Sequence, residues 1–256
     1  MSGHSKWSTI KHKKALNDAK KGKIFSKLSV LITQAARQGG GDPNMNPTLR
    51  LLLDEAKSEG FPADNIKKAI DKGTGNGADS HYEEASYEGF GPGGIQLIVD
   101  VLSTNTTRVV SELRGIFTEV GGRLGDSGSV SWNFSTLGWI NLKPGKMVKS
   151  QKFGQDDIYE PENREEVELK LMDIDGINDI KEGDDETIDL YFDYKDLGRI
   201  RDQIIALGYV VKKAEIVKVA NIKKKLEGEE LEKAVNALET IEEYDDVVNI
   251  WTDLED

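Results

Sequence analysis

Residues 23–41, KIFSKLSVLITQAARQGGG, carry the clearest periodic pattern in the chain. The apolar residues recur at the spacing of one helix face, and they are Ile24, Phe25, Leu28, Leu31, Ile32 and Ala35. Such a stripe predicts an amphipathic helix that buries its apolar side against other helices. The three glycines at 39–41 favour an end at residue 38. We therefore expect a helical bundle in this part of the chain.

Two further short helices follow. Asn46 before Pro47 has the pattern of an N-cap and a first helical residue, and Gly60 favours the end of that helix. Pro62 opens the next helix, which ends at Gly73. Their inward-facing residues are Leu49, Leu52, Leu53 and Ala56, then Ile66, Ala69 and Ile70. Three short amphipathic helices with tight connections predict a small bundle.

The first 24 residues, MSGHSKWSTIKHKKALNDAKKGKI, form a basic arm with a single acid, Asp18. Residues 8–20 predict a fourth helix, and we expect Gly22 to break it from the helix that begins at residue 23. The arm predicts phosphate contacts, and its Trp7 is either a base-stacking residue or an anchor to the bundle. An ordinary solvated helix face is the alternative. The candidate nucleic-acid-binding residues are Lys6, Trp7, Lys11, His12, Lys13, Lys14, Lys20, Lys21, Lys23, Lys27, Arg37 and Arg50.

Charge divides the chain in two. Residues 1–72 hold 14 Lys and Arg against 7 Asp and Glu, a net charge of +7. The remaining residues hold 20 against 39, a net charge of −19, which gives −12 in total. A basic segment on an acidic body favours a polyanionic partner for the basic part. We expect the acidic part to stay clear of nucleic acid and to contact protein.

The periodicity changes after a Gly-rich and acidic linker at 74–94. Short apolar or alternating runs predict strands, and 3.6-residue stripes predict helices. The expected elements are a strand at 95–102, a helix at 104–120 and strands at 129–134 and 139–142. A turn at 143–154 then precedes a helix at 165–172, strands at 177–180 and 187–192, a helix at 197–207 and a strand at 209–219. A helix at 229–241 and a strand at 247–251 end the series.

These elements predict an α+β protein in which a three- to four-helix bundle precedes two ferredoxin-like α+β domains with antiparallel sheets. The first of these lacks a helix and a strand until 229–251, so the second is inserted into it. The expected domains are 1–78 for the arm and bundle, 79–135 with 221–256 for a discontinuous domain, and 136–220 for the inserted domain.

No pattern indicates a catalytic site, a cofactor or a metal centre. Gly89-x-Gly91-x-x-Gly94 matches the dinucleotide fingerprint, but it precedes a strand and contains Pro92, so it predicts a turn and domain connection. The run at 173–176 imitates a calcium loop, but its Gly is two positions early and no Glu stands at position twelve. The acidic stretch 156–196 is a solvated face or a docking surface for a basic protein.

Composition excludes several other classes. Cys is absent, which excludes disulfides, thiolate metal sites and cysteine nucleophiles. No run approaches the roughly eighteen apolar residues of a membrane helix, and the N-terminus lacks the apolar core of a secretory signal. We expect a cytoplasmic monomer that does not bind membranes.

The chain resembles the YebC/PmpR family over nearly its whole length. The motifs that carry the resemblance are GHSKW at 3–7, IKHKK at 10–14, DAKKGKIF at 18–25, GGGDP at 39–43, NP at 46–47, LR at 49–50, DNI at 64–66, KGTG at 72–75 and YEGFGPGG at 87–94. The chain departs from the family at Gly60-Phe61, where Asn-Met is usual, and at Ala63, where Lys is usual. The loop at 104–108 has fewer Asn and Arg residues than is usual in the family. These departures remove positive charge near 63 and 106.

The resemblance implies three domains, the third inserted into the second. It also implies a regulator of gene expression, described for bacterial members as a transcriptional regulator or a ribosome-associated factor that relieves stalled elongation. The first hypothesis is an RNA- or ribosome-binding factor that contacts rRNA or tRNA through its arm and ribosomal proteins through its acidic domains. The second is a regulator that binds promoter DNA, and the third, an enzyme, lacks a recognisable site.

Overall fold

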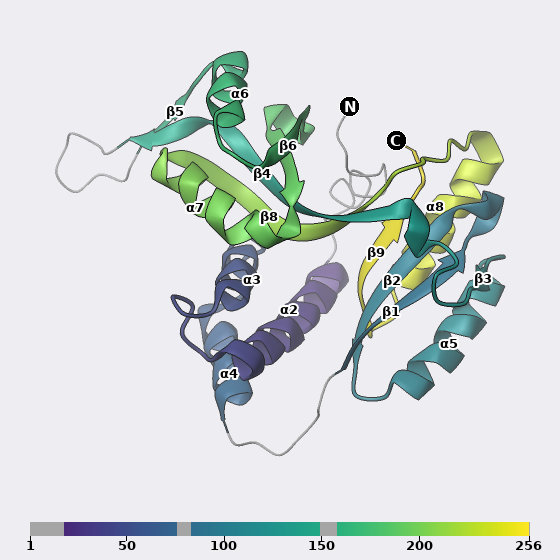
Figure 1. The fold of residues 1–256 in the computed structure, drawn as a ribbon. Helices are drawn as coiled ribbons and strands as arrows, with labels where there is room; N and C mark the ends of the chain where they lie inside the picture. The colour runs from purple at the N-terminus through teal and green to yellow at the C-terminus, as the bar shows by residue number, and fades with distance from the viewer. Residues whose placement is uncertain (1–17, 76–82, 149–157, 256) are drawn as a thin grey trace. The chain divides into compact units, whose positions relative to one another are not determined.

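The computed structural model describes residues 18–75, 83–148 and 158–255 (Figure 1). The chain separates into two compact units. One contains the described part of Thr136–Lys218, and the other contains the described parts of His4–Ser135 and Val219–Asp256. The N-terminal helices followed by strand-rich segments confirm the expected mixed α+β class. The finer division at 78, 135 and 220 stays a prediction.

The second of these units begins with three helices that surround a small apolar core. They are α2 (Asp18–Gly39), α3 (Pro47–Ser58) and α4 (Ala63–Thr74). Leu28 and Ile32 of α2 are buried with Leu49 of α3, Ala69 of α4 and Phe61 of the turn between the last two helices. The predicted cap at Asn46 is present, because its side chain accepts the N–H of Leu49 at 3.0 Å. One expectation is wrong: α2 continues through Gly22 without a break.

A close approach joins α2 to α4. Gly73 is buried, and a Cβ atom at this position would lie 2.3 Å from the Thr33 carbonyl oxygen and 2.8 Å from Ala36 Cβ. The Thr33 hydroxyl also donates to the carbonyl of Ala69 at 3.2 Å. A side chain larger than hydrogen at Gly73 therefore would not fit this crossing.

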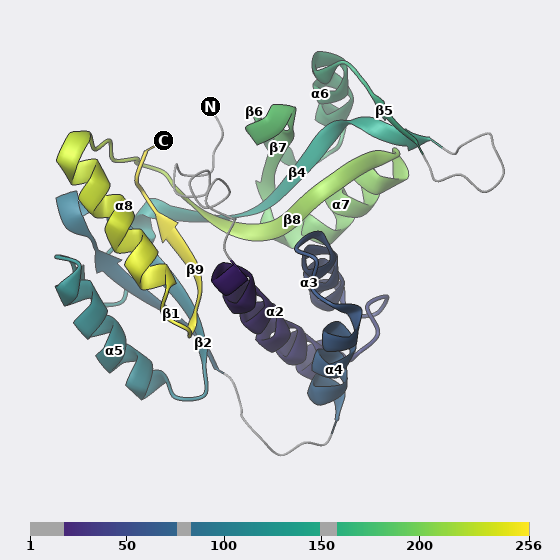
Figure 2. The ribbon, with the colours of Figure 1, turned by 180° about the vertical axis from the view of Figure 1, so that it is seen from behind.

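The same unit contains a four-stranded antiparallel sheet with strand order β3-β1-β2-β9. Its elements are β1 (Glu83–Phe90), β2 (Gln96–Ser103), α5 (Thr106–Glu119), β3 (Arg123–Leu124), α8 (Gly228–Glu242) and β9 (Val247–Thr252). Both helices lie on one face of the sheet, as Figure 2 shows from behind. Leu97 and Val99 of β2 are buried there against Leu113 and Phe117 of α5 and Leu238 of α8.

The other unit is a second antiparallel sheet covered by two helices. Its elements are β4 (Phe134–Val148), β5 (Ile158–Pro161), α6 (Arg164–Met172), β6 (Ile177–Glu182), β7 (Ile188–Asp193), α7 (Leu197–Ala206) and β8 (Tyr209–Ala220). The order is β5-β4-β7-β6, and β8 pairs with β4. Apart from β5, the elements follow the β-α-β-β-α-β pattern of the split βαβ motif. In the four-stranded sheet, by contrast, β1 precedes the other elements, which was not expected from the sequence.

Four local expectations are corrected. The segment 83–90, expected in a linker, is β1, and 143–148, expected in a turn, continues β4. Ser131–Asn133, expected in a strand, forms a 3-10 turn. The glycine motif 89–94 is a turn, as expected, but it connects β1 to β2 of one sheet rather than two domains.

Within the described residues, no helix combines the length and apolar character needed to cross a membrane.

Candidate nucleic-acid interface

The structure describes only part of the predicted interface. Lys6, Trp7, Lys11, His12, Lys13 and Lys14 lie outside the described residues. Lys20, Lys21 and Lys23 fall in the first turns of α2, and their side chains also lie outside the described part. Their roles as nucleic-acid contacts therefore stay predictions.

The three remaining candidates are described, and they have different surroundings. Lys27 of α2 is half-buried, and its Nζ donates to the carbonyl oxygen of Glu242 at 3.3 Å. Arg37 is exposed in the last turn of α2, where the negative end of the helix dipole favours a cation. Arg50 is half-buried in the first turn of α3. Arg37 is thus the most accessible of the three.

Three exposed lysines of α4 were not identified as candidates from the sequence. Lys67, Lys68 and Lys72 are exposed, and none forms an ion pair with a carboxylate of the described residues. The main-chain nitrogen of Arg37 would lie 3.2 Å from a Cβ atom at Gly73, so the α2–α4 crossing brings Arg37 beside the last turn of α4. The amphipathic pattern could have revealed these lysines, because Ile66, Ala69 and Ile70 point inward and leave them on the outer face.

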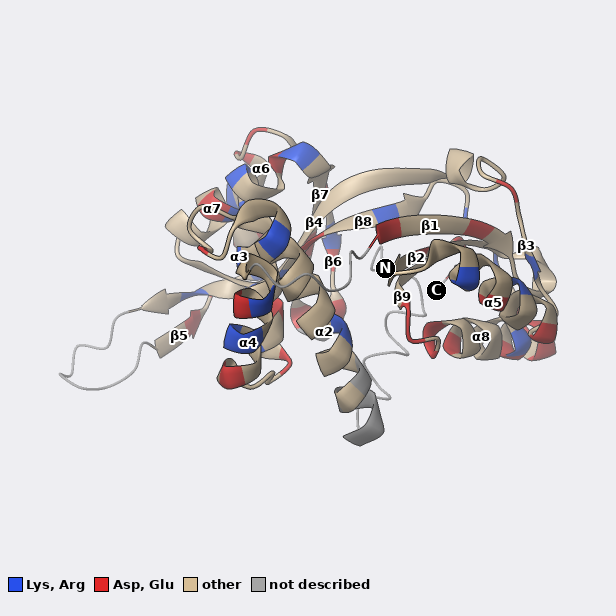
Figure 3. Ribbon diagram, turned by 90° about the horizontal axis from the view of Figure 1, so that it is seen from below, with Lys and Arg blue, Asp and Glu red and all other residues tan. Residues whose placement is uncertain are grey.

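Charge on the bundle is mixed rather than uniformly positive. The exposed acids Asp64 and Asp71 alternate with the lysines of α4, as the blue and red bands of Figure 3 show. On α3, Lys57 Nζ lies 3.8 Å from Asp54 Oδ1, and both side chains are largely exposed. A surface pair of this kind is weak, so it leaves Lys57 able to meet a phosphate.

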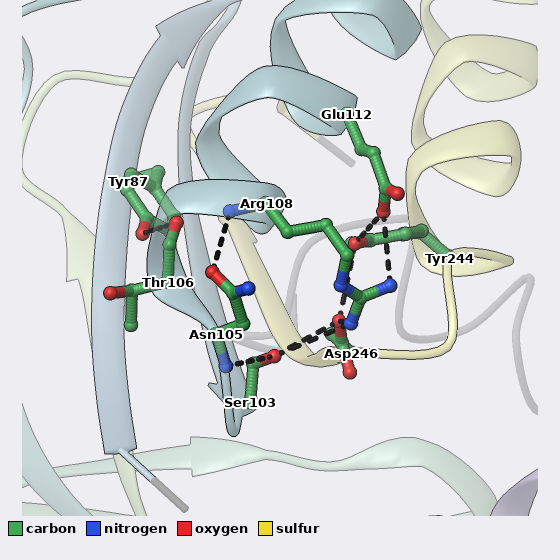
Figure 4. A network of polar contacts seen from close by, with 8 residues as sticks. All are labelled: Tyr87, Ser103, Asn105, Thr106, Arg108, Glu112, Tyr244 and Asp246. Carbon is green, nitrogen blue, oxygen red and sulfur yellow. Dashed lines mark hydrogen bonds and ion pairs between the residues drawn. The ribbon is translucent and has the colours of Figure 1, made fainter.

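A second polar cluster joins the start of α5 to the turn between α8 and β9 (Figure 4). Arg108 Nη2 lies 2.5 Å from Asp246 Oδ2, and its Nη1 lies 3.3 Å from Glu112 Oε2. The Tyr244 hydroxyl donates to Glu112 and to Asp246. Burial, and then the hydrogen bond to Glu112, raise the pKa of Tyr244. Because two carboxylates already neutralise Arg108, this cluster holds α5 and β9 together rather than offering a free cation to phosphate.

Glu88 of β1 organises the loop that precedes β4. Its carboxylate accepts the main-chain N–H groups of Gly128 at 2.8 Å, Val130 at 2.6 Å and Ser131 at 2.9 Å. Burial alone would raise the pKa of Glu88, but these donors outweigh it and the pKa is lowered. The ionised carboxylate therefore fixes the conformation of this loop.

A buried carboxylate lies in the other unit. Asp189 of β7 is buried, and its Oδ1 accepts the Asn141 amide at 2.7 Å. Burial raises the pKa of Asp189, although the hydrogen bonds from Asn141 and Trp139 oppose the shift. Within the described residues, no group of three or more His, Cys, Asp or Glu side chains is arranged to hold a metal.

The run at 173–176, which resembles the start of a calcium loop in sequence, forms the turn from α6 to β6. Gly176 adopts a φ of 94° between α6 and β6, and the Asp175 carbonyl accepts Arg199 Nη2 at 3.0 Å. This carbonyl is thus occupied by a guanidinium.

Two family models match nearly the whole chain. The model described as the TACO1/YebC protein N-terminal domain matches residues 5–76, and the model described as the TACO1/YebC second and third domain matches residues 82–254. The chain belongs to the TACO1/YebC family. The resemblance to the YebC/PmpR family is thereby confirmed.

Similar proteins from bacteria are named as transcriptional regulators. A protein of Geotalea uraniireducens and one of Chloroherpeton thalassium are each 41% identical over 255 residues, covering 100% of this chain and 96% of their own. Both are named "Probable transcriptional regulatory protein". The crystal structure of a conserved hypothetical protein from Aquifex aeolicus matches with a TM-score of 0.81 and 34% identity, covering 98% of this chain and 97% of that one. This member of the TACO1/YebC family thus has relatives named as regulators.

Proposed function

We propose that this protein is a non-enzymatic regulator of gene expression that binds nucleic acid through its basic N-terminal part. Its target is RNA, in the form of rRNA or tRNA on the ribosome, and it relieves stalled elongation. The observation that carries the proposal is the charge division of +7 over residues 1–72 against −19 over the rest. Lysines that contact the phosphates of a nucleic acid release its bound counterions, which favours binding. The acidic remainder of the chain is repelled by the same phosphates.

The exposed residues of the bundle support this assignment. The apolar stripes of α2, α3 and α4 are used in the bundle core, so the outer faces carry polar and charged side chains. Arg37 in the last turn of α2 and Lys72 in the last turn of α4 are both exposed, and the main-chain nitrogen of Arg37 lies beside Gly73 at the α2–α4 crossing. Contacts of this kind position a protein on a backbone without reading its sequence, which suits a structured RNA better than one promoter.

We assign the acidic remainder of the chain, residues 73–256, to contacts with basic ribosomal proteins. The charge of −19 over residues 73–256 favours such partners. Carboxylates without a nearby lysine or arginine would supply these contacts.

One observation favours the alternative of a DNA-binding transcriptional regulator. The helices α3 and α4 are joined by the short turn 59–62, in which Gly60 has a φ of 74°. A short turn with Gly between two helices is also found in helix-turn-helix motifs, whose second helix enters the major groove. Lys67 and Lys68 of α4 would then contact DNA, but the neighbouring Asp64 and Asp71 would be repelled by its phosphates.

Ribosome co-sedimentation separates the two functions. The full chain is expected to co-sediment with ribosomes, and the double variant Lys13→Glu with Lys20→Glu is expected to stay in the supernatant. Binding to promoter duplexes that resists raised salt and depends on sequence, with no ribosome association, would instead establish the DNA-binding function. In that case Lys67→Glu with Lys68→Glu should abolish duplex binding.

Crosslinking in cells, followed by sequencing of the attached nucleic acid, identifies the target directly. Ribosomal or transfer RNA is expected. Enrichment of promoter DNA without RNA would contradict the proposal.

A further inference from the structure

The end of the four-stranded sheet where β1 turns into β2 has a composition unlike the rest of the acidic part. We name it the hairpin end, and define it as the turn 91–94, Arg123, Trp132 and the segment 221–225. The sequence of that segment is NIKKK, a run of three lysines in a part of the chain with 20 basic and 39 acidic residues.

Asn133 brings these pieces together. It is buried, and its amide donates to the Ile222 carbonyl at 2.9 Å while its Oδ1 accepts the Ile222 N–H at 2.8 Å. The same amide donates to Gln96 at the start of β2, at 3.0 Å. Trp132 directly precedes Asn133, so Trp132 and Ile222 are held beside the same end of the sheet.

Trp132 is a large apolar side chain on the surface. It is 62% exposed, and Ile222 is 63% exposed. The indole N–H donates to the Ser129 carbonyl at 3.0 Å, and the loop around Ser129 is fixed by the three N–H groups that bond to Glu88. An exposed aromatic ring on a fixed loop loses little conformational entropy when it binds a flat ligand. The Trp132 ring is not part of the hydrophobic core of the sheet, so the core does not depend on it.

The lysine run is also fixed by its main chain. The Lys224 N–H donates to the Asp253 carbonyl at 2.7 Å, and its Nζ donates to the Gly94 carbonyl at 3.3 Å. Lys223 and Lys225 are exposed, whereas Lys224 is half-buried. Lys225 pairs with Glu227 at 2.7 Å, but the two side chains are 68% and 76% exposed, so the pair is weak.

Arg123 adds a further cation at the same end. It is exposed, and its guanidinium lies 4.5 Å from the centre of the Phe90 ring, the last residue of β1. Exposed carboxylates close to these cations in the sequence are Asp126, Glu227, Glu229 and Glu230, and Glu255 donates its main-chain N–H to the Lys224 carbonyl. Glu88 is not among them as a free charge, because it accepts three main-chain N–H groups. The exposed cations, Lys223, Lys225 and Arg123, do not outnumber the exposed carboxylates, which suits a short contact led by the aromatic ring rather than a long basic track.

We propose that the hairpin end binds a single-stranded nucleic acid, with Trp132 stacking on a base and Lys223, Lys225 and Arg123 contacting the adjoining phosphates. Stacking on an exposed aromatic ring beside lysines is the usual way in which proteins hold an unpaired strand. A duplex cannot use this site, because its bases are already stacked on one another. The proposal rests on the proposed function only in that the ligand is nucleic acid, since the site is separate from the N-terminal arm.

The test measures fluorescence anisotropy of a labelled oligouridine with the full chain at about 50 mM salt, where the electrostatic part of binding is strong. Trp132→Ala should weaken binding about tenfold, and Trp132→Phe should retain most of the affinity. Lys223→Glu with Lys225→Glu should weaken binding at least as much and lower the salt slope by about 1.4, or about 0.7 per phosphate. Arg114→Glu, an exposed charge reversal on α5, is the control and should leave the affinity within about twofold.

The outcomes separate this inference from the proposed function. Unchanged affinity in Trp132→Ala and in the double lysine variant, alongside a loss in Lys13→Glu with Lys20→Glu, overturns the hairpin end and leaves the arm in place. The reverse pattern supports the hairpin end and overturns the role of the arm. A wild-type chain that binds no single strand overturns both. Circular dichroism of each variant confirms that the fold is kept.

Discussion

Glu88 shows how one carboxylate can determine a local conformation. Its three main-chain N–H donors come from a loop that no periodic pattern in the sequence describes, since 125–131 is rich in Gly and Ser. The run YEGFGPGG identified the family but did not reveal that its glutamate fixes a loop about forty positions further on. Contacts between segments so distant in sequence depend on the tertiary fold and leave no local signal.

Replacement of Glu88 by Gln is expected to destabilise the protein by about 1–3 kcal/mol near neutral pH, because an amide cannot accept three N–H groups equally well. Since the folded-state pKa of Glu88 is lowered, its contribution is present above the ordinary value of 4.5 and is lost as the pH falls through the lowered pKa. Urea unfolding at several pH values measures this. Equal acid sensitivity in the wild type and the variant would rule out the role of Glu88.

Asp189 should have the opposite pH dependence. Burial raises its folded-state pKa above the ordinary 3.8, so the folded state binds more protons and its stability falls as the pH rises above that value. Asp189→Asn removes the titration, so the stability advantage of the wild type over the variant should shrink as the pH rises from the ordinary value of 3.8 through the raised folded-state pKa. A difference that grows with pH, measured by urea unfolding, would show that Asp189 is stabilised as an anion.

The candidate site was predicted only in part at the level of single residues. The basic arm was evident from composition, whereas the partner of Lys27, the Glu242 carbonyl, lies more than two hundred positions away and could not be foreseen. Lys67, Lys68 and Lys72 could have been found, because the inward stripe of their helix assigns them to the outer face.

Helices were easier to predict than strands. The helices α3, α4 and α7 follow stripes and Gly or Pro signals that are written into the local sequence. β1, with sequence EEASYEGF, has few apolar residues, and its strand character comes from pairing along its whole length with β2. Pairing partners determine such a strand, so its own pattern predicted a linker.

The two glycines at 22 and 73 provide a matched pair of helix tests. Gly73→Ala would place a methyl group 2.3 Å from the Thr33 carbonyl, so we expect a loss of about 1–3 kcal/mol in the free energy of unfolding. Gly22→Ala meets nothing within 4 Å and should stabilise α2 by about 0.5–1 kcal/mol. Thermal and urea unfolding measure both. A stable Gly73→Ala variant would show that α2 and α4 do not cross closely, and a destabilised Gly22→Ala variant would restore the break expected there.

At the scale of the whole molecule, charge and chain order were the most informative features of the sequence. The inference that the elements at 229–251 complete a unit begun near residue 95 agrees with β9 pairing with β2. What the sequence did not indicate was that β1 lies between β2 and β3, because strand order within a sheet depends on long-range pairing. The division of charge between a cationic N-terminal part and an anionic remainder is the basis of the proposed function.

The decisive measurement is the affinity of the full chain for single-stranded RNA as a function of salt, for the wild type and for Lys13→Glu with Lys20→Glu. We predict a steep loss of wild-type affinity with salt and at least about tenfold weaker binding by the variant at about 150 mM salt. The control Lys212→Glu with Lys233→Glu changes the net charge equally at exposed positions outside the N-terminal part and should bind like the wild type. Unchanged binding by the arm variant, or an equal loss in the control, would contradict the account.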